Sequence, residues 1–127
     1  MKYLLDTHTF LWWHDQPNCL SPIVLEICQD TDNKLFLSMI SVWEIQIKLQ
    51  LNKLTLNTPL VKMLALQQLN GIHIMPIEVS HILELQNLPL FHKDPFDRLI
   101  IAQSRVENAI LLSKDEQFQS YPVTVIW

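Results

Sequence analysis

The sequence predicts an α/β protein in which a short parallel sheet is flanked by helices on both faces. Short, mostly apolar segments of four or five residues recur along the chain, and segments with a helical spacing of apolar residues lie between them. Short strands that alternate with helices are typical of crossover units, which join parallel strands. The chain has 127 residues and contains neither a linker nor an internal repeat. We therefore expect one three-layer domain over residues 1–127.

The expected strands are short, and most of them are almost wholly apolar. The first begins directly after the amino terminus, and the last alternates between apolar and polar residues at the end of the chain. The segments that we expect to form strands are 2–5, 34–38, 72–75, 109–113 and 123–127.

Helix boundaries are marked by capping residues, prolines and residues that tolerate a left-handed backbone. Three helix starts place a capping residue before a proline, whose missing N–H is harmless in the first turn: Ser21-Pro22, Thr58-Pro59 and Asp94-Pro95. Ser41 is expected to cap a further helix, which Asn52 ends in a left-handed conformation. Gly71 should end the helix that begins after Pro59. Two more helices are expected, near 10–14 and 79–86.

Composition and charge exclude several classes of protein. The net charge is −4 and no run of basic residues exists, which by itself argues against nucleic-acid binding. Acidic side chains that hold a divalent ion would weaken this objection, because the ion then sets part of the local field. Gly71 is the only glycine, so neither a dinucleotide-binding fingerprint nor a phosphate-binding loop is present.

Hydropathy gives no sign of a membrane segment. Every apolar run is far shorter than the roughly 18 residues that a membrane span needs. The first five residues reach Asp6 too soon for a secretory signal. We expect a soluble, cytoplasmic protein that does not associate with membranes.

Acidic residues stand where the predicted strands end and the predicted helices begin. Asp6 follows the first strand directly, and Asp115 follows the fourth strand by two residues. Glu44 and Asp97 fall in the first turns of two predicted helices. Open parallel sheets bind ligands beyond the carboxyl ends of their strands. Four carboxylates that meet there would repel one another strongly unless a divalent cation lay among them.

Each of these acids also has a simpler interpretation. Asp6 suits a cap for the helix that follows it, and Asp115 suits the start of a turn. Asp97 and Glu44 each stand three residues after a candidate cap, as in a capping box. No single acid decides between the interpretations, whereas four acids on the ligand-binding edge of a sheet favour a metal site.

Five short motifs, spread over the whole chain, carry a family resemblance. They are Leu5-Asp6-Thr7-His8 with Leu11-Trp12-Trp13; Ser41-Val42-Trp43-Glu44-Ile45 with Lys48; Asn52-Lys53-Leu54; His92-Lys93-Asp94-Pro95-Phe96-Asp97-Arg98-Leu99-Ile100-Ile101-Ala102-Gln103; and Leu112-Ser113-Lys114-Asp115 with Phe118. With these motifs the chain resembles the PIN-domain proteins, and among them the VapC-like toxin ribonucleases of type II toxin–antitoxin pairs. The fourth motif is highly specific, and the Trp-Glu-Ile motif is moderately so.

The resemblance implies a fold, an activity and partners. The fold would be a single PIN-like nuclease domain. The activity would be that of an endoribonuclease that depends on Mg²⁺ or Mn²⁺ and hydrolyses RNA phosphodiester bonds. A cognate antitoxin protein would silence it. Four tryptophans and many leucines in so small a chain also suggest a homodimer.

The resemblance also assigns roles to individual residues. Asp6, Glu44 and Asp97 match the family's main metal-binding acids, and Asp115 matches a fourth that varies more across the family. Hydroxyls that support these acids are matched by Thr7 and Ser113, and Asp94 is expected to act beside them as a helix cap. Gln117 stands where some relatives carry a further acid, so Asp115 has to serve alone.

The chemistry that we expect at this site uses oxygen ligands. Carboxylates suit Mg²⁺ or Mn²⁺ better than zinc, and the sequence has no HExxH motif. Asp6 and Asp97 would be the main ligands, and Glu44 would bind directly or through water. Asp115 would be a ligand or would accept a proton from the attacking water.

Basic and aromatic residues near the acids are candidates for contacts with RNA. Arg98 is adjacent to Asp97, although it also suits an ion pair with that carboxylate. The tryptophans allow stacking on bases, but their helical spacing favours packing or an interface. The candidate phosphate contacts are His92, Lys93, Arg98, Lys48 and Lys53, and the tryptophans concerned are Trp12, Trp13 and Trp43.

The main alternative function is that of a catalytically weak binding or regulatory domain with the same fold. Such a protein would keep part of the acidic set and would bind metal without cleaving RNA. The presence of all four acids favours the enzyme.

Overall fold

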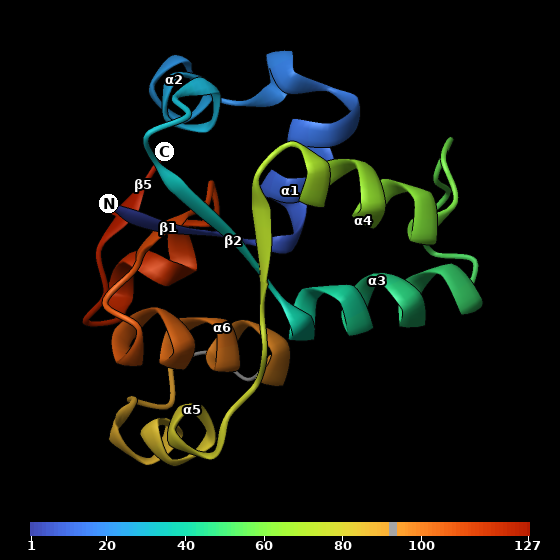
Figure 1. Cartoon of the computed structure of the whole chain (residues 1–127). Coiled ribbons are helices and arrows are strands. Elements are labelled where there is room, and N and C mark those ends of the chain that lie inside the picture. The colour runs from blue at the N-terminus through green and yellow to red at the C-terminus, as the bar shows by residue number, and fades with distance from the viewer. Residues whose placement is uncertain (92–93) are drawn as a thin grey trace.

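The computed structural model describes residues 1–91 and 94–127, which form a sheet of five parallel strands with helices on both faces (Figure 1). The strand order is β3-β2-β1-β4-β5. The strands are β1 (Lys2–Leu5), β2 (Lys34–Ser38), β3 (Ile72–Met75), β4 (Ile110–Leu112) and β5 (Val125–Ile126). All five lie where the sequence predicts them, and the parallel sheet is confirmed.

The register of the central strands brings their carboxyl ends level with one another. Leu5 at the end of β1 pairs with Leu37 on one side and with Leu112 on the other. The residues that follow these three positions are therefore neighbours along one edge of the sheet. All three are polar: Asp6, Ser38 and Ser113. The prediction that polar groups gather at this edge is confirmed.

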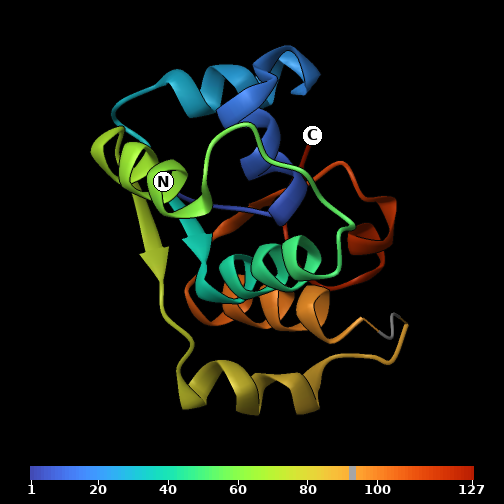
Figure 2. The same cartoon turned by 90° about the vertical axis from the view of Figure 1, so that its right-hand side faces the viewer.

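Six α-helices are described, and they lie on both faces of the sheet (Figure 2). The buried side chains form two separate apolar clusters, one on each face. Leu5, Phe10 and Ile45 belong to the cluster on one face, and Leu4 and Ile100 belong to the cluster on the other. Successive strand residues thus point to opposite layers, as a pleated strand requires. The helices are α1 (Thr7–Asp15), α2 (Pro22–Gln29), α3 (Met39–Gln50), α4 (Leu60–Leu69), α5 (Val79–Glu84) and α6 (Pro95–Val106), with 3₁₀ turns at Pro17–Cys19, Leu85–Asn87 and Glu116–Ser120.

Most helix boundaries agree with the sequence, and two caps differ. The cap of α3 is Ser38, whose hydroxyl accepts from the Ile40 N–H, so the expectation of a Ser41 cap was wrong. The strand runs straight into the helix, and this places Ser41 inside the first turn. Thr58 does not cap α4 either, because Pro59 occupies the cap position and no side chain caps that end.

The two residues expected to end helices both adopt a left-handed backbone conformation. Asn52 follows α3 with φ of 56°, and Gly71 follows α4 with φ of 97°. Both angles lie in the left-handed region, which asparagine tolerates and glycine adopts freely. None of the described helices combines the length and the hydropathy that a bilayer span requires.

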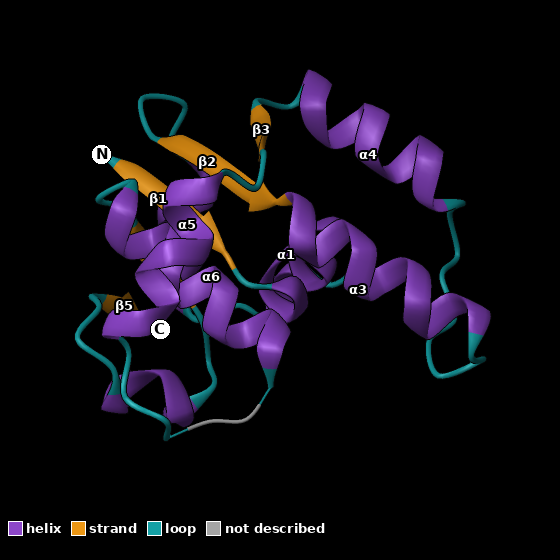
Figure 3. Cartoon of the chain, turned by 90° about the horizontal axis from the view of Figure 1, so that it is seen from below, coloured by secondary structure: helices purple, strands orange, loops and turns teal. Residues whose placement is uncertain are grey.

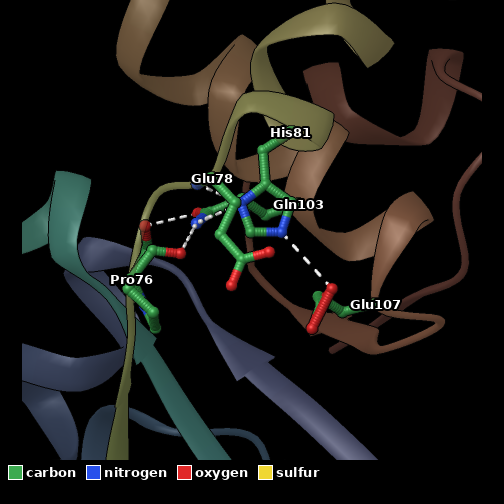
Figure 4. Close-up of polar contacts among 6 residues, drawn as sticks. Pro76, Glu78, His81, Gln103 and Glu107 are labelled. Atoms are coloured by element: carbon green, nitrogen blue, oxygen red, sulfur yellow. Dashed lines mark hydrogen bonds and ion pairs between the residues drawn. The ribbon is translucent and has the colours of Figure 1, made fainter.

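A buried polar network joins α5 and α6 to the sheet (Figure 4). Gln103 on α6 is fully buried, accepts a hydrogen bond from Ser38 and donates one to the Pro76 carbonyl at 3.3 Å. His81 on α5 accepts from the Glu78 N–H at 3.0 Å through Nδ1, and its Nε2 lies 3.3 Å from a carboxylate oxygen of Glu107. These bonds tie helices from distant parts of the sequence to the end of β2. On the other side, α6 also contacts α3 (Figure 3).

We expect the Gln103→Leu variant to lose about 2–3 kcal/mol of its free energy of unfolding. The leucine fills much of the same volume, but the Ser38 hydroxyl and the Pro76 carbonyl lose a buried partner. Urea unfolding measures the loss. The matched control is Gln68→Leu on the exposed face of α4, which should change the free energy by less than about 0.5 kcal/mol. Equal effects of the two variants would contradict this role.

Candidate active site

A pocket of about 340 Å³ opens at the edge of the sheet where β1 and β4 end. It is lined by side chains from four parts of the chain that are far apart in sequence. The acids in its wall are Asp6, Glu44, Asp94, Asp97 and Asp115; the basic groups are His8, Lys48 and Lys114; the remaining residues are Thr7, Trp12 and Phe118. All four acids that the sequence singled out therefore face the same cavity.

Asp6 is the most deeply buried of these acids and is held on both carboxylate oxygens. Oδ1 caps α1 by accepting from the Thr9 N–H at 2.8 Å, and Oδ2 accepts from the Ser113 hydroxyl. Asp6 is thus a helix cap and a pocket residue at once. Burial raises the pKa of this carboxyl above its ordinary value, although the bonds from Ser113 and Thr9 act in the opposite direction. A positive charge in the pocket would offset the cost of burying the carboxylate.

Glu44 lies in the second turn of α3, one turn further along than expected, because α3 begins at Met39. Its side chain still reaches the pocket and is held there by two partners. The Thr7 hydroxyl donates to Oε1 at 2.7 Å, and Lys48 Nζ lies 2.9 Å from Oε2. The Thr7 and Ser41 hydroxyls share a further hydrogen bond of 2.9 Å. Thr7 thus supports an acid of the pocket.

Asp94 and Asp97 occupy the start of α6. Asp94 Oδ1 accepts from the Phe96 N–H at 2.9 Å and from the Asp97 N–H at 3.4 Å, which confirms its role as the cap of that helix. Asp97 lies in the first turn, and its side chain lines the pocket with that of Asp94. The amino end of a helix favours negative charge, so this position suits both carboxylates.

Asp115 closes the pocket from the loop after β4. Its Oδ1 accepts from the Gln117 N–H at 3.0 Å, and its own N–H donates to Ser113 Oγ at 3.1 Å. Ser113 therefore joins Asp115 to Asp6 through one hydroxyl. The Asp115 side chain is exposed, unlike that of Asp6. Solvent and a substrate can reach it directly.

Comparison with protein families decides the identity of this fold. The model of the PIN domain matches residues 3–123. The chain belongs to the PIN-domain family. The resemblance seen in the sequence motifs is thereby confirmed, and so is the expected fold class. Ribonuclease VapC22 of Mycobacterium tuberculosis is 30% identical to this PIN domain over 96% of the chain and 96% of that protein.

Solved structures show the same fold at lower identity. VapBC2 from Rickettsia felis, bound to a DNA fragment from its promoter, matches with a TM-score of 0.75 and 19% identity over 99% of this chain and 98% of that one. FitAcB from Neisseria gonorrhoeae matches with a TM-score of 0.67 and 21% identity, over 98% and 96% of the two chains. At these identities the likeness concerns the fold.

The donor set of this PIN domain suits a hard divalent cation. Five carboxyl groups and two lysines line the pocket, so its wall carries an excess of negative charge. Within residues 1–91 and 94–127, however, no three histidine, cysteine or acidic side chains are gathered closely enough to form a ready-made metal site. Mg²⁺ keeps several of its water ligands and is commonly bound through one or two carboxylates. The pocket therefore fits an ion that two acids hold directly and others hold through water.

The residues predicted to contact phosphate lie in different places in the structure. Lys48 lines the pocket, whereas Arg98 does not. The Arg98 guanidinium donates to the Pro89 carbonyl at 2.7 Å and to the Leu85 carbonyl at 3.4 Å. These bonds hold the segment before α6 in place, and a phosphate contact at Arg98 stays a prediction. His92 and Lys93 lie outside the described residues.

Sequence reasoning missed several groups of the pocket wall. Lys114 was not a candidate, although it directly precedes Asp115 on the same loop. His8 was not a candidate either, although it is exposed and lines the pocket. For Trp12 the sequence favoured packing or an interface over stacking on bases, and its ring packs against the apolar layer and also lines the pocket. Lys114 and His8 each stand within two residues of a pocket acid, and this proximity was the available signal.

Proposed function

We propose that this PIN domain is a metal-dependent endoribonuclease and the toxin of a type II toxin–antitoxin pair. The observation that carries the proposal is the convergence of Asp6, Glu44, Asp97 and Asp115 on one pocket at the ligand-binding edge of the sheet. The chain is also similar in sequence, along almost its full length, to a protein named as a ribonuclease.

Asp6 and Asp97 are the proposed main ligands of Mg²⁺ or Mn²⁺. When bound, such an ion lowers the pKa of a coordinated water and neutralises charge that develops on the phosphate. Asp6 is fixed for this role, because Thr9 and Ser113 hold its two oxygens. Glu44 is held in the pocket by Thr7 and binds the ion directly or through water.

Asp115 is the proposed acceptor for a proton of the attacking water. Its carboxylate is exposed at the mouth of the pocket, where a water and the scissile phosphate can both approach. Oδ1 already accepts from the Gln117 N–H, so Oδ2 is the oxygen that takes the proton. Ser113 keeps Asp115 and Asp6 in a fixed relation, because it donates to one and accepts from the N–H of the other.

A cognate antitoxin is the proposed protein partner. Solved structures of the same fold include one described as a toxin–antitoxin complex and one described as a member of the VapBC family of toxin–antitoxin systems. Several large apolar side chains are exposed here, including Val61, Leu69 and Leu90 at 75%, 84% and 86%. Exposed apolar residues of this kind suit association with an antitoxin or with a second copy of the chain.

Incubation of the purified protein with total cellular RNA tests the proposed activity. We expect cleavage in Mg²⁺ or Mn²⁺, none in EDTA, and recovery when the ion is restored. A catalytically weak binding domain is the second candidate, and the lack of a ready-made three-ligand site among the described residues favours it. That protein would bind Mn²⁺ but would leave the RNA intact under every condition.

A further inference from the structure

The pocket wall contains a basic and aromatic group that the acids do not explain. Lys114 Nζ lies 5.9 Å from the centroid of the Trp12 ring, within the distance of a cation–π contact. The Trp12 ring also lies 5.8 Å from that of His8 and 5.7 Å from that of Trp127. Lys114, Trp12 and His8 all line the same pocket as the four acids.

Lys114 differs from Lys48, the other lysine of the wall, in what it contacts. Lys48 forms an ion pair of 2.9 Å with Glu44, so its charge is largely committed. Lys114 is exposed, and among the described residues it forms no ion pair with a carboxylate. It can therefore bind an anion without giving up a bond to an acid.

The positive charge of Lys114 would offset part of the repulsion between this acidic pocket and RNA. RNA is a polyanion, the chain has a net charge of −4, and the pocket wall is mostly acidic. Proteins attract nucleic acids chiefly through lysine and arginine contacts to phosphates. A lysine next to Asp115 is suitably placed to hold a phosphate beside the acids.

Trp12 is held in a fixed relation to the same acids. It belongs to α1, the helix that Asp6 caps, and its ring is only partly buried against the apolar layer. Flat aromatic rings at the wall of a charged groove bind single-stranded nucleic acids by stacking on their bases. Trp43 is 57% exposed, but it packs edge-on against Phe96 and does not line the pocket.

We propose that Trp12 and Lys114 together bind single-stranded RNA. Trp12 stacks on a base next to the scissile phosphate, and Lys114 binds a neighbouring phosphate. This assignment rests on the proposed function and extends it, because it names two residues of the pocket wall that would hold the RNA beside the acids. An unpaired base can leave its stack and lie on the indole ring, which a base in a duplex cannot do without unpairing.

Binding of a labelled 12-nucleotide RNA tests the assignment. Fluorescence anisotropy is measured in Mg²⁺ in an Asp97→Asn background, so that the RNA is not consumed. Trp12→Leu should weaken binding about tenfold, and Trp12→Phe should retain most of it. Lys114→Met should lower the slope of log Kd against log salt by about 0.7, the value for one phosphate contact on a single strand. Trp13→Leu and Lys62→Met are matched controls away from the pocket and should change neither quantity.

A second RNA probe keeps the test independent of how well the Trp12 variant folds. An oligomer of the same length with no bases should bind the Asp97→Asn protein about tenfold more weakly than the RNA, and Trp12→Leu should remove this preference. Equal binding of the two oligomers, or parental affinity and salt slope in both variants, would overturn the assignment. A parent protein that cleaves no RNA at all would instead overturn the proposed function.

Discussion

Asp6→Asn and Asp97→Asn should each reduce RNA cleavage at least about 10³-fold, because each removes a proposed ligand of the catalytic ion. The asparagine side chain has nearly the same shape, so the pocket keeps its outline but loses the negative charge and one acceptor oxygen. Initial rates on a fixed RNA substrate in saturating Mg²⁺ measure the effect. Cleavage by either variant at the parental rate would remove that residue from the metal site.

The fold of the Asp6→Asn variant should be at least as stable as that of the parent. Burial raises the pKa of Asp6, so the folded state binds this proton more tightly than the unfolded chain does. The carboxylate therefore lowers the free energy of unfolding as pH rises from the ordinary range of aspartate through the raised pKa. Asparagine removes that pH-dependent loss, and urea unfolding at neutral pH separates lost chemistry from lost folding.

Glu44→Gln and Lys48→Met should change metal binding in opposite directions. Glu44→Gln removes a proposed ligand and should reduce cleavage about 10²-fold or more. Lys48→Met removes a positive charge 2.9 Å from Glu44 and should tighten Mn²⁺ binding about tenfold in the absence of RNA. Titration calorimetry with Mn²⁺ measures the second effect.

A control variant and a double variant test whether Lys48 acts on the ion through Glu44. Lys53→Met provides a control, because Lys53 is exposed and does not line the pocket. The Glu44→Gln/Lys48→Met double variant should bind Mn²⁺ no better than Glu44→Gln alone, since Lys48 acts on the ion through Glu44. If Lys48→Met weakened Mn²⁺ binding, the lysine would not be the counter-ion of an acid that holds the metal.

Sequence reasoning located the strands and the edge of the site because both depend on local signals. A run of three apolar residues marks each of β1 and β2, and a polar residue follows each run directly. The register of the parallel strands then places those polar residues side by side at the carboxyl edge of the sheet, where parallel sheets bind ligands. Asp6 and Asp115 could be placed in this way without any knowledge of side-chain geometry.

Details that depend on tertiary contacts could not be read from the sequence. Ser38 and Ser41 are both plausible caps for α3, and only the abrupt passage from β2 into the helix selects Ser38. That choice moves Glu44 into the second turn. Arg98 follows Asp97 in sequence, yet successive helical residues point in different directions, and its guanidinium binds the Pro89 carbonyl instead.

The position of a bound ion tests the central claim most directly. Crystals grown or soaked in Mn²⁺ would locate the ion by its anomalous scattering. We predict a peak inside the pocket, about 2 Å from carboxylate oxygens of Asp6 and Asp97, which disappears in the Asp6→Asn variant. The crystals should contain Mn²⁺ at a concentration that supports cleavage. If the pocket then shows no anomalous peak, or if the ion lies elsewhere, the result would contradict the account.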